Sequence, residues 1–458
     1  MTVLTRQLLK GSLWTIGAFG LGQAIRLGTN VVLARLLAPE LFGIMLIVNS
    51  LRLGIELISD VGIFQNIVYH KNANDPAFYN TAWTLGAIRG VVLWLAVLVF
   101  AVPAARFYQS PILAFVLPVA TFGPFVLLGF SSISRTLLPK RLQIAKLNAF
   151  DTIVSFVSSV VYVLSAYFSP TIWALVFGGL FSSAATMIGS YFLLPDVTQK
   201  FYLSKRFVFE ILHFAKWIFV SSVVYFLATN FDRLYLGKII PLELLGVYGI
   251  ARTFSELSSM LVLSLGHTVL FPFITAHSQE PRVALREQLA TIRTKFLLLA
   301  ALGVSLFATT ADLVIRILYD ERYHEASWML PVLIIGSWFS ILANINESTL
   351  LGLGRPSYNA VANSLKLAFI LFGLPLSVKV YGLLGGITVV AFADLCRYIP
   401  VLVGQRRERF SFGMQDLLVT LTVFLLIVLW EWLRSVSGFG NSFESLPIDM
   451  SQFFGNGR

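Results

Sequence analysis

The chain has 458 residues, of which 57% are hydrophobic and only 12% are charged, and its mean hydropathy is +0.80. Soluble domains carry about 25% charged residues, which excludes an ordinary water-soluble protein. Apolar runs of about 20 residues recur along the whole chain, and each is long enough to cross the hydrocarbon core of a bilayer. The alternating segments of about ten residues that are typical of a membrane β-barrel are absent. The sequence therefore predicts an all-α polytopic membrane protein.

The net charge of +11 lies largely in short loops between the apolar runs, where it indicates orientation in the membrane rather than nucleic-acid binding. Cys396 is the only cysteine, so an internal disulfide is impossible. The five histidines are scattered without the spacing of metal ligands, and the glycine-rich phosphate loop of ATPases is absent. We therefore expect no metal, no cofactor and no catalytic residues.

The apolar runs predict twelve helices, at about 12–37, 42–67, 80–106, 111–136, 147–168, 170–194, 211–236, 243–270, 289–312, 326–351, 359–380 and 382–404. The first run is far longer than the 7–15-residue core of a signal peptide, so it is expected to be an uncleaved helix. Gly and Pro interrupt the fourth, tenth and eleventh helices and permit bending there. A thirteenth run covers residues 417–433 and follows a basic loop.

A short internal repeat suggests that the chain has two similar halves. The stretch RLLAPELFG (Arg35–Gly43) aligns with KIIPLELLG (Lys238–Gly246) at a shift of 203 residues, 238 minus 35. The same shift places Trp14 on Trp217, in the apolar run before each copy. Each copy is a short polar turn between two apolar runs, so each predicts a hairpin between two membrane helices. Transporters are often built from such repeats.

The predicted division follows from this repeat and from a polar break at residues 195–209. Residues 1–200 form an N-terminal six-helix bundle and residues 201–404 a C-terminal one, while 405–458 add a basic loop, a hydrophobic helix and a short tail. Six helices per half is an even number, so both halves enter the membrane in the same direction. A pseudo-two-fold axis along the membrane normal is the expected relation.

Positive charges predict the orientation. Loops on the side of the N-terminus hold fifteen Lys and Arg residues, whereas the opposite loops hold only Arg35, Arg106, Lys238, Arg316, Arg322 and Lys379. The N-terminus is therefore expected in the cytoplasm. If residues 417–433 span the membrane, the C-terminal tail lies outside. If they lie on the surface, the tail stays inside, and the sequence leaves both open.

Ionisable groups inside membrane helices are costly, about 2.5–3.5 kcal/mol each at mid-bilayer, so they normally face a partner or a wet cavity. The first helix carries Arg26 and Asn30 on one face. The second helix repeats polar residues every three or four positions on one face, at Asn49, Arg52, Glu56 and Asp60. The eighth helix carries Arg252 and Glu256, and Arg252 falls on Asn49 at the repeat shift.

Two interpretations of these faces are open. Arg52 with Glu56, and Arg252 with Glu256, can be ion pairs that neutralise each other between packed helices. Alternatively, the three faces line a cationic central cavity. The substrate-binding residues are then Arg26, Arg52, Arg252, Asn30 and Asn49, with Glu56, Asp60 and Glu256 in ion pairing or coupling. Arginine binds phosphate through two parallel hydrogen bonds, so such a cavity suits an anionic amphiphile.

Other charges within the predicted helices favour structural pairing. They are Arg89, Asp151, Lys366, Asp394 and Arg397. Lys216 and Asp232 fall near the two ends of the seventh helix. Their side chains can extend to water there, which is enough to explain a charge at these positions.

Several stretches resemble the polysaccharide-transport (Wzx-type) flippases of the MOP superfamily. The hairpin Arg35–Gly43 is similar to the first-loop signature of that family. Further similar stretches are SDVGIFQ (Ser59–Gln65), NTAW (Asn80–Trp83), DRLYLG (Asp232–Gly237), LGVY (Leu245–Tyr248), LYDERY (Leu318–Tyr323) and LGRP (Leu353–Pro356). The resemblance covers most of residues 1–404. It implies two six-helix bundles around a central cavity that opens to each leaflet in turn, and it carries over no set of catalytic residues.

The implied function is that of a flippase in the bacterial inner membrane. Its substrate is an undecaprenyl-diphosphate-linked oligosaccharide, moved from the cytoplasmic to the periplasmic leaflet for O-antigen, capsule or exopolysaccharide synthesis. Its expected partners are this substrate, the bilayer, and the polysaccharide polymerase and export machinery. Three alternatives remain: a cation-coupled multidrug exporter of the same superfamily, a membrane polymerase or ligase of the same pathway, and a lipid II flippase. The short loops argue against an enzyme, and the arginines beside each acidic face argue against a site for cationic drugs.

Overall fold

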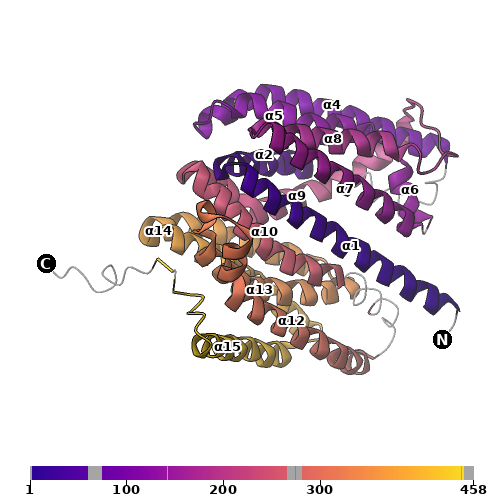
Figure 1. Cartoon of the computed structure of the whole chain (residues 1–458). Helices are drawn as coiled ribbons and strands as arrows, with labels where there is room; N and C mark the ends of the chain where they lie inside the picture. Colours follow the sequence, from indigo (N-terminus) through magenta and orange to yellow (C-terminus); the bar gives the residue numbers. More distant parts are fainter. Residues whose placement is uncertain are drawn as a thin grey trace. The chain divides into compact units, whose positions relative to one another are not determined.

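The computed structural model describes residues 3–59, 75–141, 143–265, 274, 281–444 and 446–447. This part of the chain is helical, without strands (Figure 1). The elements are α1 Val3–Leu36, α2 Pro39–Ile58, α4 Pro76–Phe107, α5 Leu113–Phe122, η1 Gly123–Leu127, α6 Ser134–Lys140, α7 Ile144–Phe168, α8 Ile172–Ser190, α9 Lys205–Ile239, α10 Leu242–Leu265, α12 Arg282–Leu318, η3 Glu321–Tyr323, α13 Ala326–Gly352, α14 Ser357–Arg407 and α15 Gly413–Val436.

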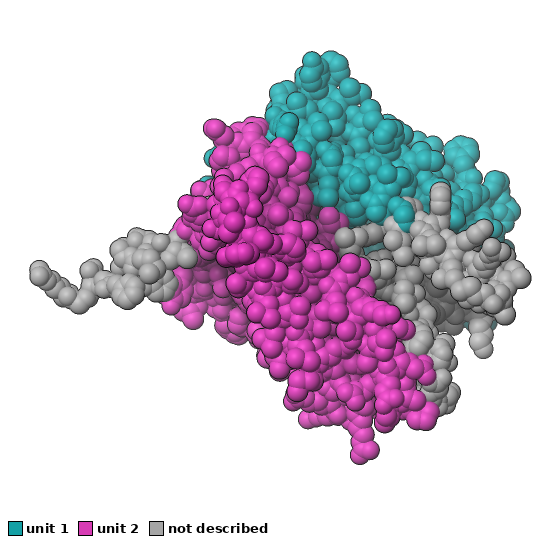
Figure 2. Space-filling model, turned by 60° about the horizontal axis from the view of Figure 1, so that its bottom comes forward, with its two compact units in different colours: residues 1–226, 233–245 teal, residues 227–232, 246–458 magenta. Residues whose placement is uncertain are grey.

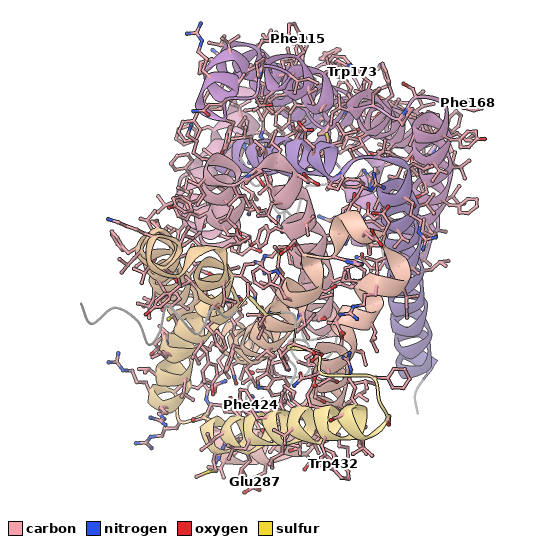
Figure 3. The ribbon with its side chains drawn as sticks, turned by 60° about the vertical axis from the view of Figure 1, so that its left-hand side comes forward. Phe115, Phe168, Trp173, Glu287, Phe424 and Trp432 are labelled. Atoms are coloured by element: carbon pink, nitrogen blue, oxygen red, sulfur yellow. The ribbon has the colours of Figure 1, made fainter. Side chains whose placement is uncertain are left out.

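Within the described residues, eight helices are long and apolar enough to cross a membrane: α2, α4, α7, α8, α12, α13, α14 and α15. Large apolar side chains point outward from several of them, as lipid-facing residues should. Figure 3 labels Phe168 on α7 and Trp432 on α15 among these, and both are well exposed. The prediction of a polytopic all-α membrane protein is confirmed.

The chain folds as two compact units, coloured separately in Figure 2. The first unit holds residues 1–226 and 233–245, and the second holds 227–232 and 246–458. The predicted division at residues 200 and 404, and the two-fold relation of two six-helix bundles, stay predictions.

Both predicted hairpins are present at equivalent positions. Helix α1 ends at Leu36 and α2 begins at Pro39, while α9 ends at Ile239 and α10 begins at Leu242. Both boundaries therefore repeat at the shift of 203 residues found in the sequence. Pro39 suits the first turn of α2, where its missing N–H costs nothing, and Glu40 lies in the same turn near the positive end of the helix dipole. The side chains of Trp14 and Trp217 lie outside the described residues.

The fourth predicted helix, 111–136, is not continuous. It consists of α5, the π-helical turn η1 and the separate helix α6, with residues 130–133 between them in turn and bend conformations. Pro124 in η1 has no N–H to donate, which disturbs the regular ladder. Side chains take over part of the freed hydrogen bonding, since Ser190 Oγ accepts from the amide of Ser132 at 2.7 Å. The expectation of a single bent helix is corrected to a broken span.

The polar segment that links the two halves of the sequence is hydrogen-bonded to the first turns of α4. The amides of Lys200, Tyr202 and Ser204 donate to the side chains of Asn80, Thr84 and Thr81 at 2.9, 3.1 and 3.2 Å. Asn80 and Thr81 belong to the family-like stretch NTAW. This stretch therefore has a structural role in holding the join.

Helix α14 contains the eleventh and twelfth predicted helices, with a sharp turn between them. Gly382 has φ of 62° and ψ of −152°, a conformation that side chains disfavour. The predicted boundary between residues 380 and 382 is confirmed.

Helix α15 runs along α12 in the second unit and is fixed to it near both ends. Asp416 accepts a hydrogen bond from Arg293 near the start of α12, and Arg434 pairs with Asp312 near its end at 2.6 Å. All four side chains are buried. Asp416 and Arg434 are 18 residues apart, about 27 Å along a helix, which is nearly the hydrocarbon thickness of a bilayer. The two helices run in the same direction, and α15, like α12, is long and apolar enough to cross a membrane.

Candidate functional site

Arg26 lies in the C-terminal half of α1, and its side chain is exposed. Among the described residues, no hydrogen bond or ion pair joins its guanidinium to another side chain. Asn30 lies one turn further along α1 and is half-buried. Gln23 lies one turn earlier, and its buried Oε1 has no hydrogen-bond partner in the described part of the chain. The structure thus places a cation without a charged partner among the described residues beside amide groups, on the first of the helices that the sequence predicts to cross the membrane.

Arg52 on α2 is engaged by a carboxylate. Its Nη1 donates to Glu56 Oε2 at 2.6 Å, one helical turn away. Asn49 lies one turn before Arg52 and is exposed. Asp60, the fourth polar residue predicted on this face, lies outside the described residues. The pairing of Arg52 with Glu56 is the local arrangement that their spacing permits.

Arg89 on α4 closes the end of α2. Its Nη2 donates to the carbonyl oxygen of Glu56 at 2.6 Å, and its Nε donates to that of Ser59 at 2.9 Å. The last carbonyls of a helix have no partner within the helix, so this arginine satisfies groups that would otherwise be left in an apolar medium. The structural role expected for Arg89 is confirmed.

Arg252 on α10 lies between two carboxylates of the second unit. Its Nε is 3.3 Å from Asp232 Oδ2 and 3.4 Å from Glu256 Oε1. The hydroxyl of Tyr248 donates to the same oxygen of Asp232. Asp232 is only 2% exposed, so the expectation that it reaches water from the end of its helix is wrong. Only its place in the family-like stretch DRLYLG hinted at this role, because its partners come from another helix.

A second buried network joins α13 to the two halves of α14. Asp394 accepts from Lys366 Nζ at 2.9 Å and from Arg397 Nη1 at 3.1 Å, and Arg397 also binds Glu347 and Asn344. These groups alternate in charge and neutralise one another. The structural pairing predicted for Lys366, Asp394 and Arg397 is confirmed, and Asp151 likewise pairs with Arg135 at 2.8 Å.

The three arginines predicted to bind substrate therefore differ in their surroundings. Arg52 and Arg252 are held by carboxylates, whereas Arg26 has no charged partner among the described residues. Arg26 and Arg52 belong to the first unit and Arg252 to the second. Chemically, Arg26 can take an anion directly, while Arg52 and Arg252 must exchange a carboxylate for it. No group of three metal-binding side chains occurs in the part of the chain that the structure describes.

Comparison with known sequences gives a consistent set of relatives. A family model described as "Polysaccharide biosynthesis protein" matches residues 32–328. The succinoglycan biosynthesis transport protein ExoT of Rhizobium meliloti (strain 1021) is 25% identical over 341 residues, which cover 72% of this chain and 66% of ExoT. The lipopolysaccharide biosynthesis protein WzxC of Escherichia coli (strain K12) is 22% identical over 364 residues, which cover 79% of this chain and 70% of WzxC. The matches thus span about two thirds of these relatives' length.

Among solved structures, the lipid II flippase MurJ in its inward closed conformation has a similar fold. The TM-score is 0.71 at 14% identity, and the match covers 94% of each chain. An inward-facing MATE-family multidrug resistance transporter of the MOP superfamily gives a TM-score of 0.65 at 14% identity, covering 89% of this chain and 99% of the other. At such low identity the likeness concerns the fold, which is that of the MOP transporters.

Proposed function

The chain belongs to the family of polysaccharide biosynthesis proteins, and from this premise we propose that it is a flippase for lipid-linked oligosaccharides. It moves undecaprenyl-diphosphate-linked repeat units from the cytoplasmic to the periplasmic leaflet of the bacterial inner membrane. These units serve the synthesis of exopolysaccharide, O-antigen or capsule. The names of two relatives, a succinoglycan transport protein and a lipopolysaccharide biosynthesis protein, support this substrate class.

The observation that carries the proposal is the state of Arg26. The first apolar run, which carries Arg26, is predicted to cross the membrane, where a guanidinium is costly unless it meets a partner or water. Within the described residues the protein supplies no partner for Arg26, although it supplies one for Arg52 and for Arg252. A diphosphate has the charge and the geometry to fill this position, because a guanidinium binds phosphate through two parallel hydrogen bonds.

The paired arginines give the transport cycle a release step. Arg52 and Arg252 bind the diphosphate in exchange for Glu56 and Glu256, and the same carboxylates take the arginines back when the substrate leaves. This competition keeps the binding of the anion reversible. While the substrate is bound, Glu56 and Glu256 are released from the arginines and can bind a coupling cation. Asn30 and Asn49 contact the sugar or phosphate oxygens. The lipid tail stays in the bilayer while the head group crosses, and no covalent step occurs.

The proposed topology has the N-terminus in the cytoplasm and α15 crossing the membrane. The two buried ion pairs at the ends of α15 support a full crossing, because they match α12 over about 27 Å. The C-terminal tail then lies in the periplasm, where the polymerase that consumes the repeat units acts.

Deletion of the gene tests the function. We expect loss of surface polymer, with lipid-linked repeat units retained in the cytoplasmic leaflet, and restoration of both by the wild-type gene. Normal polymer together with greater sensitivity to cationic drugs would instead indicate a multidrug exporter. Accumulation of unpolymerised repeat units in the periplasmic leaflet would indicate a polymerase or ligase.

A further inference from the structure

The segment between α8 and α9, residues 191–204, lies at the end of two membrane spans of the first unit, and we call it the link segment. Helix α8 has 19 residues, about 28 Å, which is close to the hydrocarbon thickness of a bilayer. The link segment follows α8 directly and is hydrogen-bonded to the first turns of α4, a second helix long and apolar enough to cross a membrane. It therefore lies at the level where the apolar core of a bilayer meets the head groups.

The backbone of the link segment is held in place. Every second amide, at Lys200, Tyr202 and Ser204, donates to a side chain of α4. Contacts that recur at every second residue are typical of an extended chain. Between these amides, the ring of Phe201 packs against that of Trp83 on α4, with 5.0 Å between the ring centroids. The link segment therefore presents a fixed set of side chains to its surroundings.

The apolar side chains of the link segment fall into two groups. One group is buried in a core with side chains of α4 and α6: Leu193, Leu194 and Val197. The other group is exposed: Phe192, Phe201, Tyr202 and Leu203. Phe192 and Phe201 are the most exposed of these, at 76% and 69%. Aromatic side chains are enriched where a membrane protein meets the head groups, so the exposed group suits burial in that boundary.

The charges beside this exposed group are positive. Lys200 in the link segment and Lys205 and Arg206 in the first turn of α9 are exposed, and none of the three forms an ion pair among the described residues. Asp196, the only acidic residue of the link segment, is paired with Arg141 at 2.8 Å. Lysine and arginine next to a membrane surface attract anionic lipid head groups. The charge of this surface thus complements that of an anionic bilayer.

We propose that the link segment and the first turn of α9 bind the bilayer surface through the head groups of anionic phospholipids. Lys200, Lys205 and Arg206 bind the phosphates, and the exposed aromatic side chains enter the boundary between head groups and acyl chains. The contact holds the connection between the two halves of the sequence on the membrane surface. It does not rest on transport, because every group involved lies within the first unit.

The experiment measures which lipids lie next to the link segment in the full-length chain. In a Cys396→Ser background, Leu203→Cys gives a single thiol for a fluorescent label at an exposed position of the link segment. The labelled chain is reconstituted into phosphatidylcholine liposomes with the same small fraction of nitroxide-labelled phosphatidylglycerol or nitroxide-labelled phosphatidylcholine. The ratio of the quenching by these two lipids reports how far the anionic lipid is enriched. Both leaflets have one composition, so the orientation of the chain does not affect the ratio.

We expect both lipids to quench the label, with a ratio of at least about two in favour of phosphatidylglycerol. Combined Lys200→Gln, Lys205→Gln and Arg206→Gln should lower the ratio to about one. The matched control combines Arg106→Gln, Arg316→Gln and Lys379→Gln, which removes three positive charges from exposed positions on the side predicted to be opposite, and it should keep the ratio. High salt should also lower the ratio of the chain with all its lysines and arginines intact, which provides a test that needs no charge variant to fold.

Three results would overturn the proposal. If neither lipid quenches the label, the link segment points into water, where its charges would suit an acidic protein partner instead. If the two lipids quench equally in the chain with all its charges, head-group charge has no role. If the control lowers the ratio as much as the changes at Lys200, Lys205 and Arg206, the net charge of the whole protein is the cause.

Discussion

Arg252 and Asp232 form an ion pair across two helices of the second unit, with Arg252 Nε 3.3 Å from Asp232 Oδ2. Arg252 has a second carboxylate partner, Glu256, one turn away on its own helix at 3.4 Å. The two partners differ in burial, because Asp232 is 2% exposed and Glu256 is 36% exposed. Their contributions to stability should differ accordingly.

We predict that Asp232→Asn lowers the free energy of unfolding by about 3 kcal/mol, because it leaves Arg252 partly uncompensated in a buried position. Glu256→Gln should cost less than about 1 kcal/mol, since that carboxylate is screened by its exposure. Denaturant titration of both variants in detergent provides the measurement. If both variants lose the same free energy of unfolding, burial does not determine how much each carboxylate stabilises the protein.

Transport should depend more on Arg26 than on the paired arginines. We predict that Arg26→Gln lowers the rate of translocation at least tenfold, because no other described group replaces its contact with the diphosphate. Arg52→Gln should have a smaller effect, since the same change also removes the competing ion pair with Glu56. Arg316→Gln, an exposed arginine near the end of α12, is the control for charge alone. The variants are compared by the rate at which each restores surface polymer to a deletion strain. An Arg26→Gln variant that restores it at the wild-type rate would contradict this assignment.

The two ends of α15 should lie on opposite sides of the membrane. We predict this from the two buried ion pairs that hold α15 along the full crossing of α12. In a Cys396→Ser background, Met414→Cys and Ser437→Cys place a single thiol at an exposed position near either end of α15. An impermeant maleimide should label one of them in intact cells and the other only after the membrane is opened. Labelling of both from the same side would show that α15 lies on the membrane surface.

The contact between α13 and α14 should tolerate no side chain at Gly336. A Cβ there would lie 2.2 Å from the carbonyl oxygen of Ala391, so Gly336→Ala must push the two helices apart. We predict a loss of about 1–3 kcal/mol in the free energy of unfolding. Gly303 in α12 has open space around its Cβ position, so Gly303→Ala should leave stability unchanged or raise it by up to about 1 kcal/mol. Thermal unfolding of the two variants in one detergent makes the comparison.

Much of the fold could be predicted because membrane helices and their turns have local causes. The apolar run length predicted most of the spans, and the repeat of Arg35–Gly43 located the helix ends at both hairpins to within three residues. The predicted boundary between residues 380 and 382 coincides with Gly382, whose backbone conformation only glycine adopts easily. The resemblance to polysaccharide-transport flippases is confirmed by the family match over residues 32–328.

The rest depends on contacts between helices, which spacing along one helix does not reveal. Arg52 and Glu56 are one turn apart, so their pair was a visible alternative in the sequence. Asp416 and Arg293 are separated by 123 residues, and nothing local connects them. The break in the fourth span likewise depends on neighbours such as Ser190, because proline and glycine are common in membrane helices that stay intact.

Translocation by the purified protein tests the central claim most directly. The chain is reconstituted into liposomes with a lipid-diphosphate-linked oligosaccharide, and the fraction of sugar that becomes accessible to an external glycosidase is followed over time. We predict protein-dependent exposure of the sugar in the wild type and a rate at least tenfold lower with Arg26→Gln. Wild-type liposomes that expose no more sugar than protein-free liposomes would contradict the proposed flippase function.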